Sequence, residues 1–339
     1  MLIDSAKAVR PGQPAGFEHS AFVYIDDLDF VRRAVPFLRA GLTAGEVVAV
    51  AAPRPHIALL QEHLGDCADQ VAFIDMAEAG RNPARIIPLW RELLDRHPGR
   101  PMRGIGEPAY PGRSPAELEE TRLHEALLNV AFEHTGPFRL RCPYDIQVLS
   151  PALSVAESHA VVFPADPRQG LSSPAPNREQ SWAEQAEKAF RTPLPAVPEG
   201  AVRRTFGLAD LSGLRGWAAG WARAQGLAGD RIEDLTLALH EICTNSVRFG
   251  GGRGTLSVWR EDRTLIWDVT DAGHLTDLLV GRVPAPVTDE GGRGVWLANQ
   301  LCDLVQLRSP AHTTQVRLHL TLPADSSELH APGETCRPA

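Results

Sequence analysis

Residues 230–250 read DRIEDLTLALHEICTNSVRFG, and this segment has the periodicity of an amphipathic helix. We expect the helix to span Asp230–Phe249, to begin with a capping box between Asp230 and Glu233, and to end before three glycines at 250–252. One stripe of apolar residues must face a core, and it consists of Leu235, Ala238, Leu239, Ile242 and Phe249.

A second face of the same helix carries Glu241, Asn245 and Arg248, which are spaced i, i+4 and i+7. The amide oxygen of Asn245 can ligate a hard cation such as Mg²⁺. The carboxylate of Glu241 can orient or deprotonate a nucleophile beside it. Taken alone, this pattern is also typical of an ordinary solvated helix face.

Residues 265–274, LIWDVTDAGH, alternate as a half-buried strand does and end in Asp271, with Gly273 two residues later. A carboxylate at a strand end can accept a hydrogen bond from an exocyclic amine such as that of adenine, and a glycine beside it lets the backbone approach a ring. The alternative is an ordinary Asp-Gly turn.

Residues 289–303, DEGGRGVWLANQLCD, place Gly291, Gly292 and Gly294 just before an apolar helical pattern. Glycines that lead into a helix N-terminus leave backbone N–H groups free to hold phosphate, although a flexible loop before a helix would read the same way.

The other segments of this half complete an α+β pattern. We expect strands at 202–208, 255–261, 264–271, 304–308 and 314–322, and helices at 211–226, 230–249 and 294–302. Antiparallel hairpins with helices on one face predict a two-layer sandwich.

In this order, the three motifs resemble the N, G1 and G2 boxes of the GHKL (Bergerat) ATPase fold, and the anti-sigma-factor serine kinases of the RsbW and SpoIIAB type in particular. The resemblance implies that Glu241 is the general base, that Asn245 binds Mg²⁺ and that Asp271 reads adenine. The ATP-binding residues that it implies are Asn245, Arg248, Asp271, Gly273, Gly291, Gly292, Arg293 and Gly294. One departure is Leu275, which stands where the G1 box usually has its second glycine.

The resemblance implies an anti-sigma factor of a partner-switching system in transcription regulation and stress response. It would bind ATP and Mg²⁺, sequester a sigma factor, and phosphorylate Ser or Thr of a STAS-type anti-sigma-factor antagonist. It also implies a homodimer, unless the extra domain buries the usual dimer surface. Two alternatives stay open: a binding module that has lost turnover, which Leu275 favours, and a soluble histidine kinase, for which His159 is the nearest candidate phosphoacceptor.

Upstream, residues 17–163 alternate short apolar runs with helical patterns, as a mostly parallel α/β sheet does. We expect strands at 21–25, 47–51, 71–75, 102–106 and 138–142, and helices at 28–41, 56–64, 83–97 and 114–134. The last helix opens with Ser114-Pro-Ala-Glu117, a capping-box pattern.

This half resembles the MEDS sensory domain, which recurs beside this kinase domain in RsbA-type regulators and has a RecA-like fold. The segments that carry the resemblance are FEHSAFVY (17–24), VPFLRAGLTAGEVVAVAAP (35–53), VAFIDMAEAGRNPARIIPLW (71–90), RGIGEPAYPGRSPAELEETRLHEALLN (103–129) and CPYD (142–145). No G-x-x-x-x-G-K-[ST] motif is present, which argues against nucleotide binding by a P-loop here.

Polar residues of these segments could converge on a sensor pocket for a small-molecule ligand at the carboxyl edge of the sheet. They are His19, Arg103, Glu107, Tyr110, His124, Glu125 and Asn129. The alternative is structural: Glu107 or Glu125 pairs with an arginine and braces the domain junction.

The predicted domain limits follow changes in composition. We expect a flexible N-terminus over 1–15, the sensory domain over 16–165, a Pro/Ser/Gly-rich linker over 166–198, the ATPase domain over 199–323 and a disordered tail over 324–339. Ser181–Arg191 can form a short helix within the linker, packed at the domain junction.

Composition restricts the partners and the compartment. A net charge of −8 disfavours direct binding to DNA or to an anionic membrane. The sequence has neither a signal-peptide pattern nor an apolar run long enough to span a bilayer. Its five cysteines are scattered without a C-x-x-C pair, which predicts reduced thiols in the cytoplasm, no disulfide frame and no zinc site.

Overall fold

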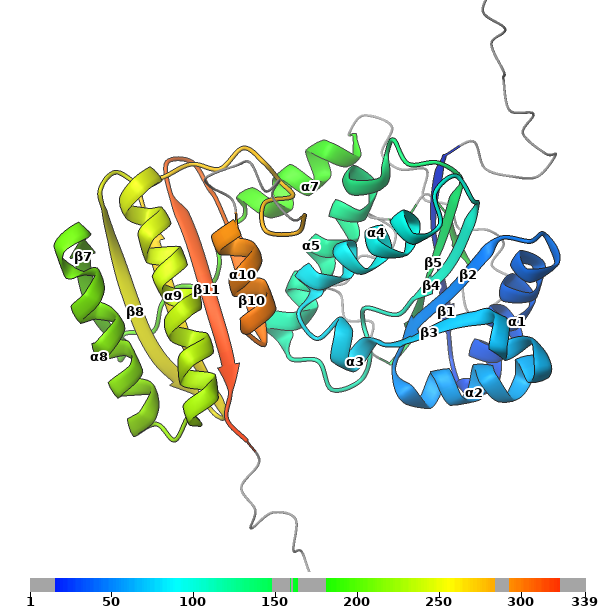
Figure 1. Cartoon of the computed structure of the whole chain (residues 1–339), viewed down its shortest axis with the longest axis horizontal. Coiled ribbons are helices and arrows are strands. Elements are labelled where there is room, and N and C mark those ends of the chain that lie inside the picture. Colours follow the sequence, from blue (N-terminus) through cyan, green and yellow to red (C-terminus); the bar gives the residue numbers. More distant parts are fainter. Residues whose placement is uncertain (1–15, 148–158, 160, 164–180, 284–292, 324–339) are drawn as a thin grey trace, which may run out of the picture.

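A computed structural model of the chain describes residues 16–147, 159, 161–163, 181–283 and 293–323. Two units lie side by side, each built on its own sheet (Figure 1). The N-terminal unit comprises the described residues between 16 and 163, and the C-terminal unit comprises those between 202 and 323. The expectations for residues 1–15 and 324–339 lie outside the described residues.

The sheet of the N-terminal unit is parallel throughout, with the strand order β3-β2-β4-β5-β1-β6. Its strands are β1 (Phe17–Tyr24), β2 (Val47–Ala52), β3 (Val71–Asp75), β4 (Met102–Gly106), β5 (Phe138–Asp145) and β6 (Val161–Phe163). All six residues of β2 are buried, as expected of a parallel strand that is covered on both faces. The parallel α/β sheet is therefore confirmed, whereas its closer likeness to RecA stays a prediction.

Helices cover both faces of this sheet. On one face, α1 (Asp27–Thr43) and α2 (Arg54–Leu64) pack on Phe22 and Val50. On the other, α3 (Met76–Ala79), α4 (Ile86–Arg96) and α5 (Pro115–Phe132) pack on Ala21 and Ala49. The alternation of strand side chains between faces thus gives each face a core of its own.

Helix α5 begins as the sequence predicts. Ser114 caps the backbone N–H of Glu117, and the Glu117 side chain accepts the backbone N–H of Ser114 at 2.7 Å. This reciprocal capping box satisfies N–H groups that the first turn leaves without helical partners. It also fixes the start of the helix that contacts the C-terminal unit.

The C-terminal unit has an antiparallel sheet with the strand order β10-β11-β9-β8-β7. Its strands are β7 (Val202–Gly207), β8 (Arg253–Glu261), β9 (Thr264–Asp271), β10 (Leu304–Arg308) and β11 (Thr314–Thr321). The helices α8 (Leu211–Ala224), α9 (Gly229–Phe249) and α10 (Arg293–Leu301) lie together on one face of it (Figure 1). The predicted α+β sandwich is confirmed.

Two details predicted for α9 are wrong. The helix begins at Gly229 with Ala228 as its N-cap, so Asp230 already lies inside the first turn and accepts the N–H of Arg231 instead of forming a capping box. Phe249 is 63% exposed, because it is the last helical residue and projects beyond the core that the rest of the stripe covers. Leu235, Ala238, Leu239 and Ile242 are buried as expected.

The last part of the predicted linker has regular structure. Helix α7 (Trp182–Arg191) starts with a capping box between Ser181 and Glu184 and packs between α5 and β10. Residues 192–201 then run along the second face of the C-terminal sheet, where Arg317 donates to the Pro195 carbonyl at 2.9 Å and pairs with Asp268 at 2.8 Å. The predicted short helix at the junction is therefore present.

None of the helices in the described ranges combines the length and the apolar character that crossing a bilayer requires.

Candidate functional site

Helix α9 holds the first two candidate residues one turn apart on its half-buried side. The side chains of Glu241 and Asn245 make no hydrogen bond to another described residue. Both lie against Gly294 at the start of α10: a methyl group there would be 2.9 Å from Asn245 Nδ2 and 3.0 Å from Glu241 Oε2. The sequence thus brings a carboxylate and a carboxamide, both unpaired, to the N-terminus of a second helix.

Asp271 is the last residue of β9, and Gly250 and Gly273 approach it closely. A methyl group on Gly250 would lie 2.4 Å from Asp271 Cγ, and one on Gly273 would lie 2.8 Å from Asp271 Oδ1. Oδ1 accepts the N–H of Gly273 at 2.7 Å, and Oδ2 has no partner within the described part of the chain. Asp271 is therefore oriented by one oxygen and offers the other as an acceptor.

The remaining predicted nucleotide residues lie around α10 and the end of α9. Arg293 and Gly294 are the first two residues of α10, whose N-terminal N–H groups are suited to an anion. Arg248 is exposed near the end of α9, with its guanidinium 5.2 Å from the ring centre of Phe249. Gly291 and Gly292 lie outside the described residues.

Leu275 does not need the backbone conformation of a glycine. Among described residues other than glycine, only Asp262 and His312 have positive φ, so Leu275 has a backbone that any residue adopts. Its N–H donates to Ser309 Oγ at 2.9 Å, and its carbonyl accepts from Arg191 at 2.7 Å. The departure from the G1 pattern is thus accommodated by hydrogen bonds from α7 and from the end of β10.

The N-terminal unit holds the C-terminal end of α10. Arg85 donates to the carbonyls of Asn299 (2.7 Å), Gln300 (2.6 Å) and Cys302 (3.0 Å). These are carbonyls without helical partners, and a guanidinium there also interacts favourably with the helix dipole. Asn82 adds a hydrogen bond to Asn299 Oδ1 at 3.0 Å.

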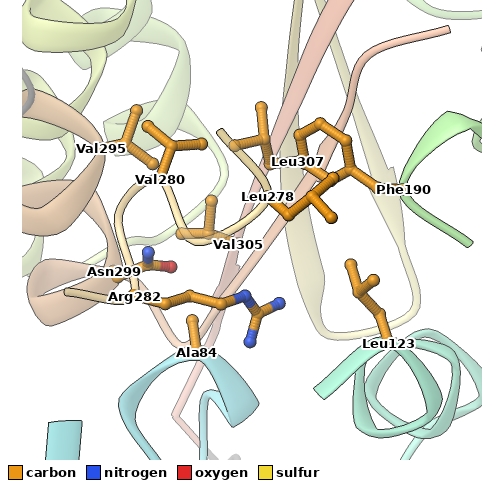
Figure 2. Close-up of a pocket in the computed structure, with 10 residues that line it drawn as sticks. All are labelled: Ala84, Leu123, Phe190, Leu278, Val280, Arg282, Val295, Asn299, Val305 and Leu307. Carbon is orange, nitrogen blue, oxygen red and sulfur yellow. The ribbon is translucent and has the colours of Figure 1, made fainter. Parts of the chain in front are cut away.

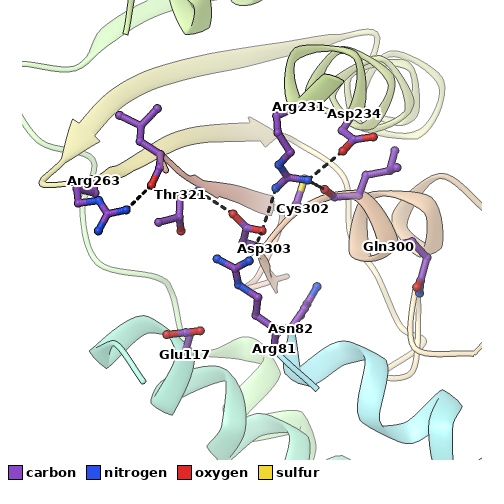
Figure 3. A network of polar contacts seen from close by, with 12 residues as sticks. Arg81, Asn82, Glu117, Arg231, Asp234, Arg263, Gln300, Cys302, Asp303 and Thr321 are labelled. Atoms are coloured by element: carbon purple, nitrogen blue, oxygen red, sulfur yellow. Dashed lines mark hydrogen bonds and ion pairs between the residues drawn. The ribbon is translucent and has the colours of Figure 1, made fainter. Parts of the chain in front are cut away.

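Charged groups extend this contact around Asp303, the residue that follows α10 and Cys302. Asp303 accepts from Arg231 at 2.9 Å and from the N–H of Thr321 at 2.7 Å, and it forms an ion pair with Arg81 at 3.2 Å (Figure 3). Arg231 and Thr321 belong to the C-terminal unit, whereas Arg81 comes from the N-terminal unit. The network therefore crosses the junction at one end of α10.

A buried carboxylate forms the second polar contact between the units. Glu120 on α5 is fully buried and pairs with Arg282 at 3.0 Å and with Arg308, both of which are nearly fully buried. Arg282 follows Gly281, whose carbonyl accepts from Asn299 Nδ2 at 2.8 Å. An acidic residue therefore does pair with arginines at the domain junction, as the structural alternative expected. The residue is Glu120, and not Glu107 or Glu125.

Apolar side chains fill the space between these polar contacts. Figure 2 shows a small pocket where the two units and α7 meet. Its lining residues are Ala84, Leu123, Phe190, Leu278, Val280, Arg282, Val295, Asn299, Val305 and Leu307. Leu278 and Val280 lie in the segment between β9 and α10, so this segment packs directly on the N-terminal unit.

Three residues of the predicted sensor pocket, Arg103, Glu107 and Tyr110, lie in separate places. Arg103 pairs with Glu46 at 2.6 Å near the start of β4. Glu107 accepts from Tyr24 at 2.8 Å and contacts His56 Nδ1 at 2.6 Å at the opposite end of that strand. Burial raises the pKa of Glu107, against the opposing effect of His56 and Tyr24. These two residues therefore have partners far from each other.

Tyr110 occupies a third position, whereas His124 lies beside Glu125, with His124 Nε2 4.0 Å from Glu125 Oε1. The Tyr110 ring lies 4.4 Å from the guanidinium of Arg113, which holds the carbonyls of Gly80 and Arg81. His124 is fully buried on α5, and burial lowers its pKa to about 3, so it is neutral at physiological pH.

His19, Glu125 and Asn129 do lie together, and two residues outside the predicted pocket join them. His19 Nδ1 is 3.2 Å from Asn129 Oδ1, and His19 Nε2 is 3.3 Å from Glu125 Oε2. The added residues are Cys142 and His159. His159 is fully buried, which argues against its serving as the phosphoacceptor of a histidine kinase.

Comparisons with known proteins find two family matches. Residues 18–160 match MEDS, the MEthanogen/methylotroph, DcmR Sensory domain, and residues 206–320 match the Histidine kinase-like ATPase domain. The chain is also similar to the serine-protein kinase RsbW of Halalkalibacterium halodurans, with 35% identity over 103 residues, 26% of this chain and 63% of the relative. The chain thus spans less than two thirds of that relative.

Among solved structures, the chain is similar to the RsbU and RsbW domains of Rv1364c from Mycobacterium tuberculosis. That match has 16% sequence identity and a TM-score of 0.28, and it covers 37% of this chain and 32% of the other.

Proposed function

We propose that this chain, whose residues 18–160 match the MEDS sensory domain and whose residues 206–320 match the Histidine kinase-like ATPase domain, is an anti-sigma factor whose RsbW-like ATPase domain is a serine/threonine kinase. It binds ATP with Mg²⁺, sequesters a sigma factor, and transfers the γ-phosphate to a Ser or Thr of a STAS-type anti-sigma-factor antagonist. It acts in the cytoplasm, as a monomer or a homodimer.

The observation that carries this proposal is the group formed by Glu241, Asn245 and Gly294. The two polar side chains have no partner among the described residues, and they lie at the N-terminus of α10. Asn245 would hold Mg²⁺, which neutralises phosphate charge when bound. Glu241 would take the proton of the attacking hydroxyl.

The rest of the site suits a nucleotide. The free Oδ2 of Asp271 accepts a hydrogen bond from the exocyclic amine of adenine, and Gly273, where a Cβ would clash with Asp271 and Phe249, lets the following backbone stay close to this carboxylate. The N-terminal N–H groups of α10, together with Gly291 and Gly292, hold the phosphates. Arg248 and Arg293 add positive charge near the triphosphate.

We further propose that the sensory domain controls this site through α10 and the segment before it. Arg85 holds one end of α10, while Gly294 at its other end touches Glu241 and Asn245. Glu120 holds Arg282 in the segment that leads toward Gly291. A shift of α5 or of residues 81–85 therefore reaches the phosphate end of the site through a single helix.

Replacing the proposed base tests the reaction. We expect Glu241→Ala to lower phosphoryl transfer by about 10²–10⁴-fold, the usual contribution of general base catalysis, and to leave ATP binding nearly unchanged. The phosphate acceptor is captured from native cells with the full chain as bait, and its phosphorylation by ATP is followed by intact mass.

Glu233→Ala is the matched control, because Glu233 is an exposed carboxylate on the same helix. Acid-stable phosphate on the captured protein supports the serine/threonine kinase. Acid-labile phosphate on the chain itself, or equal rates for Glu241→Ala and the wild type, would contradict the proposal.

Leu275→Gly tests whether the altered G1 box weakens the site. We expect the dissociation constant for ATP to change by less than about threefold, because the Leu275 peptide groups are held by Ser309 and Arg191. Stability should fall by about 1–2 kcal/mol from lost packing and higher unfolded-state entropy. If calorimetric titration instead shows a tenfold gain in affinity for ATP, this result would favour the alternative in which the domain is a binding module that has lost turnover.

A further inference from the structure

Four potential metal ligands meet under α5, within the N-terminal unit. They are His19 on β1, Glu125 on α5, Cys142 on β5 and His159 just before β6, and all four are buried. One ligand atom from each lies within 4.8 Å of every other. Imidazole, thiolate and carboxylate are the groups that bind Zn²⁺ in proteins, and four of them complete a closed tetrahedral site.

The distances between these atoms suit a shared ion. Zn²⁺ ligands at roughly 2.0–2.3 Å in a tetrahedron are separated from one another by about 3.3–3.8 Å. His19 Nε2 lies 3.3 Å from both Cys142 Sγ and Glu125 Oε2, and His159 Nε2 lies 2.8 Å from Glu125 Oε2. Small side-chain movements would therefore place all four around one metal ion.

A second observation is the orientation of His19. Its Nδ1 lies 3.2 Å from Asn129 Oδ1, an atom that can only accept a hydrogen bond, so this contact is a hydrogen bond in the tautomer that carries the proton on Nδ1. The lone pair of Nε2 then points into the cluster. Metal-binding histidines are held in this way by an acceptor on their other nitrogen.

Glu125 is the third observation. The carboxylate is 2% exposed, and imidazole nitrogens of His159, His19 and His124 lie 2.8, 3.3 and 4.0 Å from it, yet neither of its oxygens receives a hydrogen bond of regular geometry from a described residue. A buried carboxylate in this setting requires compensating positive charge or hydrogen bonds. A divalent cation among the four side chains would supply that charge.

We propose that His19, Glu125, Cys142 and His159 form a Zn²⁺ site that ties β1, β5 and His159 to α5. The site is independent of the proposed kinase function. It differs from the expectation of no zinc site, which rested on cysteine spacing alone. Because Glu125 and Glu120 share α5, occupation of the site also fixes the helix that contacts the ATPase domain.

The test is the metal content of the full chain, purified without a metal-binding tag. We expect about one zinc per chain by elemental analysis. After exchange, Co²⁺ should give the thiolate charge-transfer band and intense visible bands of a tetrahedral site. Cys142→Ala should lose the charge-transfer band, whereas Cys243→Ala, which removes a buried thiol of the other domain, should keep it.

A chelator gives a readout that does not depend on how a variant folds. Removal of the metal should lower the unfolding temperature of the wild type and of Cys243→Ala, because bound metal stabilises the folded state. Wild-type protein that takes up neither Zn²⁺ nor Co²⁺, or a charge-transfer band that survives in Cys142→Ala, would overturn the proposal.

Discussion

Glu120→Gln is expected to lower the stability of the full chain by about 3–5 kcal/mol, since it leaves two buried arginines without their carboxylate. The amide has the same shape, so packing at the junction is retained while the charge is lost. Arg282 Nη1 and Arg308 Nε already have no hydrogen-bond partner in the described ranges, which leaves the arginines few other contacts. Chemical denaturation, followed separately by tryptophan fluorescence and circular dichroism, measures the change.

Glu119→Gln is the matched control. Glu119 is the neighbouring residue on α5, its side chain is 37% exposed, and it lies 3.7 Å from Arg308. A partly exposed pair of this kind contributes about 0–1 kcal/mol. If the two variants lose the same amount of stability, Glu120 does not hold the two domains together as described.

Asn245→Ala is expected to weaken binding of Mg²⁺-ATP by at least about tenfold. A hydrogen bond or ligand contact to a charged group contributes about 1.5–3 kcal/mol, which corresponds to about 10–150-fold in affinity. The loss should be confined to the Mg²⁺ complex, because the proposed role of Asn245 is to hold the ion. Calorimetric titration with a non-hydrolysable ATP analogue, with Mg²⁺ and then with a chelator, separates these effects.

Thr236→Ala is the control for this variant. Thr236 lies nine residues earlier on α9, which places it on the opposite side of the helix. The Thr236→Ala variant should bind the ATP analogue as tightly as the wild type does. Equal weakening in both variants would indicate general damage to α9, and unchanged binding in Asn245→Ala would remove this residue from the site.

The regular elements could be predicted from sequence because their signals are local. The 3.6-residue period placed α9, and the Ser-Pro-Ala-Glu pattern placed the start of α5. The Asp230 and Glu233 pair shows the limit of such signals, since Asp230 lies two residues after the true N-cap, Ala228, and therefore forms no box. Phe249 fits the apolar period, but whether the core reaches the helix end depends on tertiary packing.

Contacts between distant segments could not be predicted in the same way. The sequence indicated that polar residues gather in the N-terminal half, but the parallel topology separates Arg103 from Glu107 along one strand. His19, Cys142 and His159 come together only because β1 pairs with both β5 and β6. The signal for Glu120 was weak: one charged residue among several on a long helix, with both partners in another domain.

Titration of the unmodified full chain with a non-hydrolysable ATP analogue tests the proposed ATP site most directly. We expect saturable binding of about one nucleotide per chain that requires Mg²⁺, through Asn245 and the N-terminus of α10. Absence of binding at millimolar concentrations of the analogue with Mg²⁺ present would contradict the proposed site.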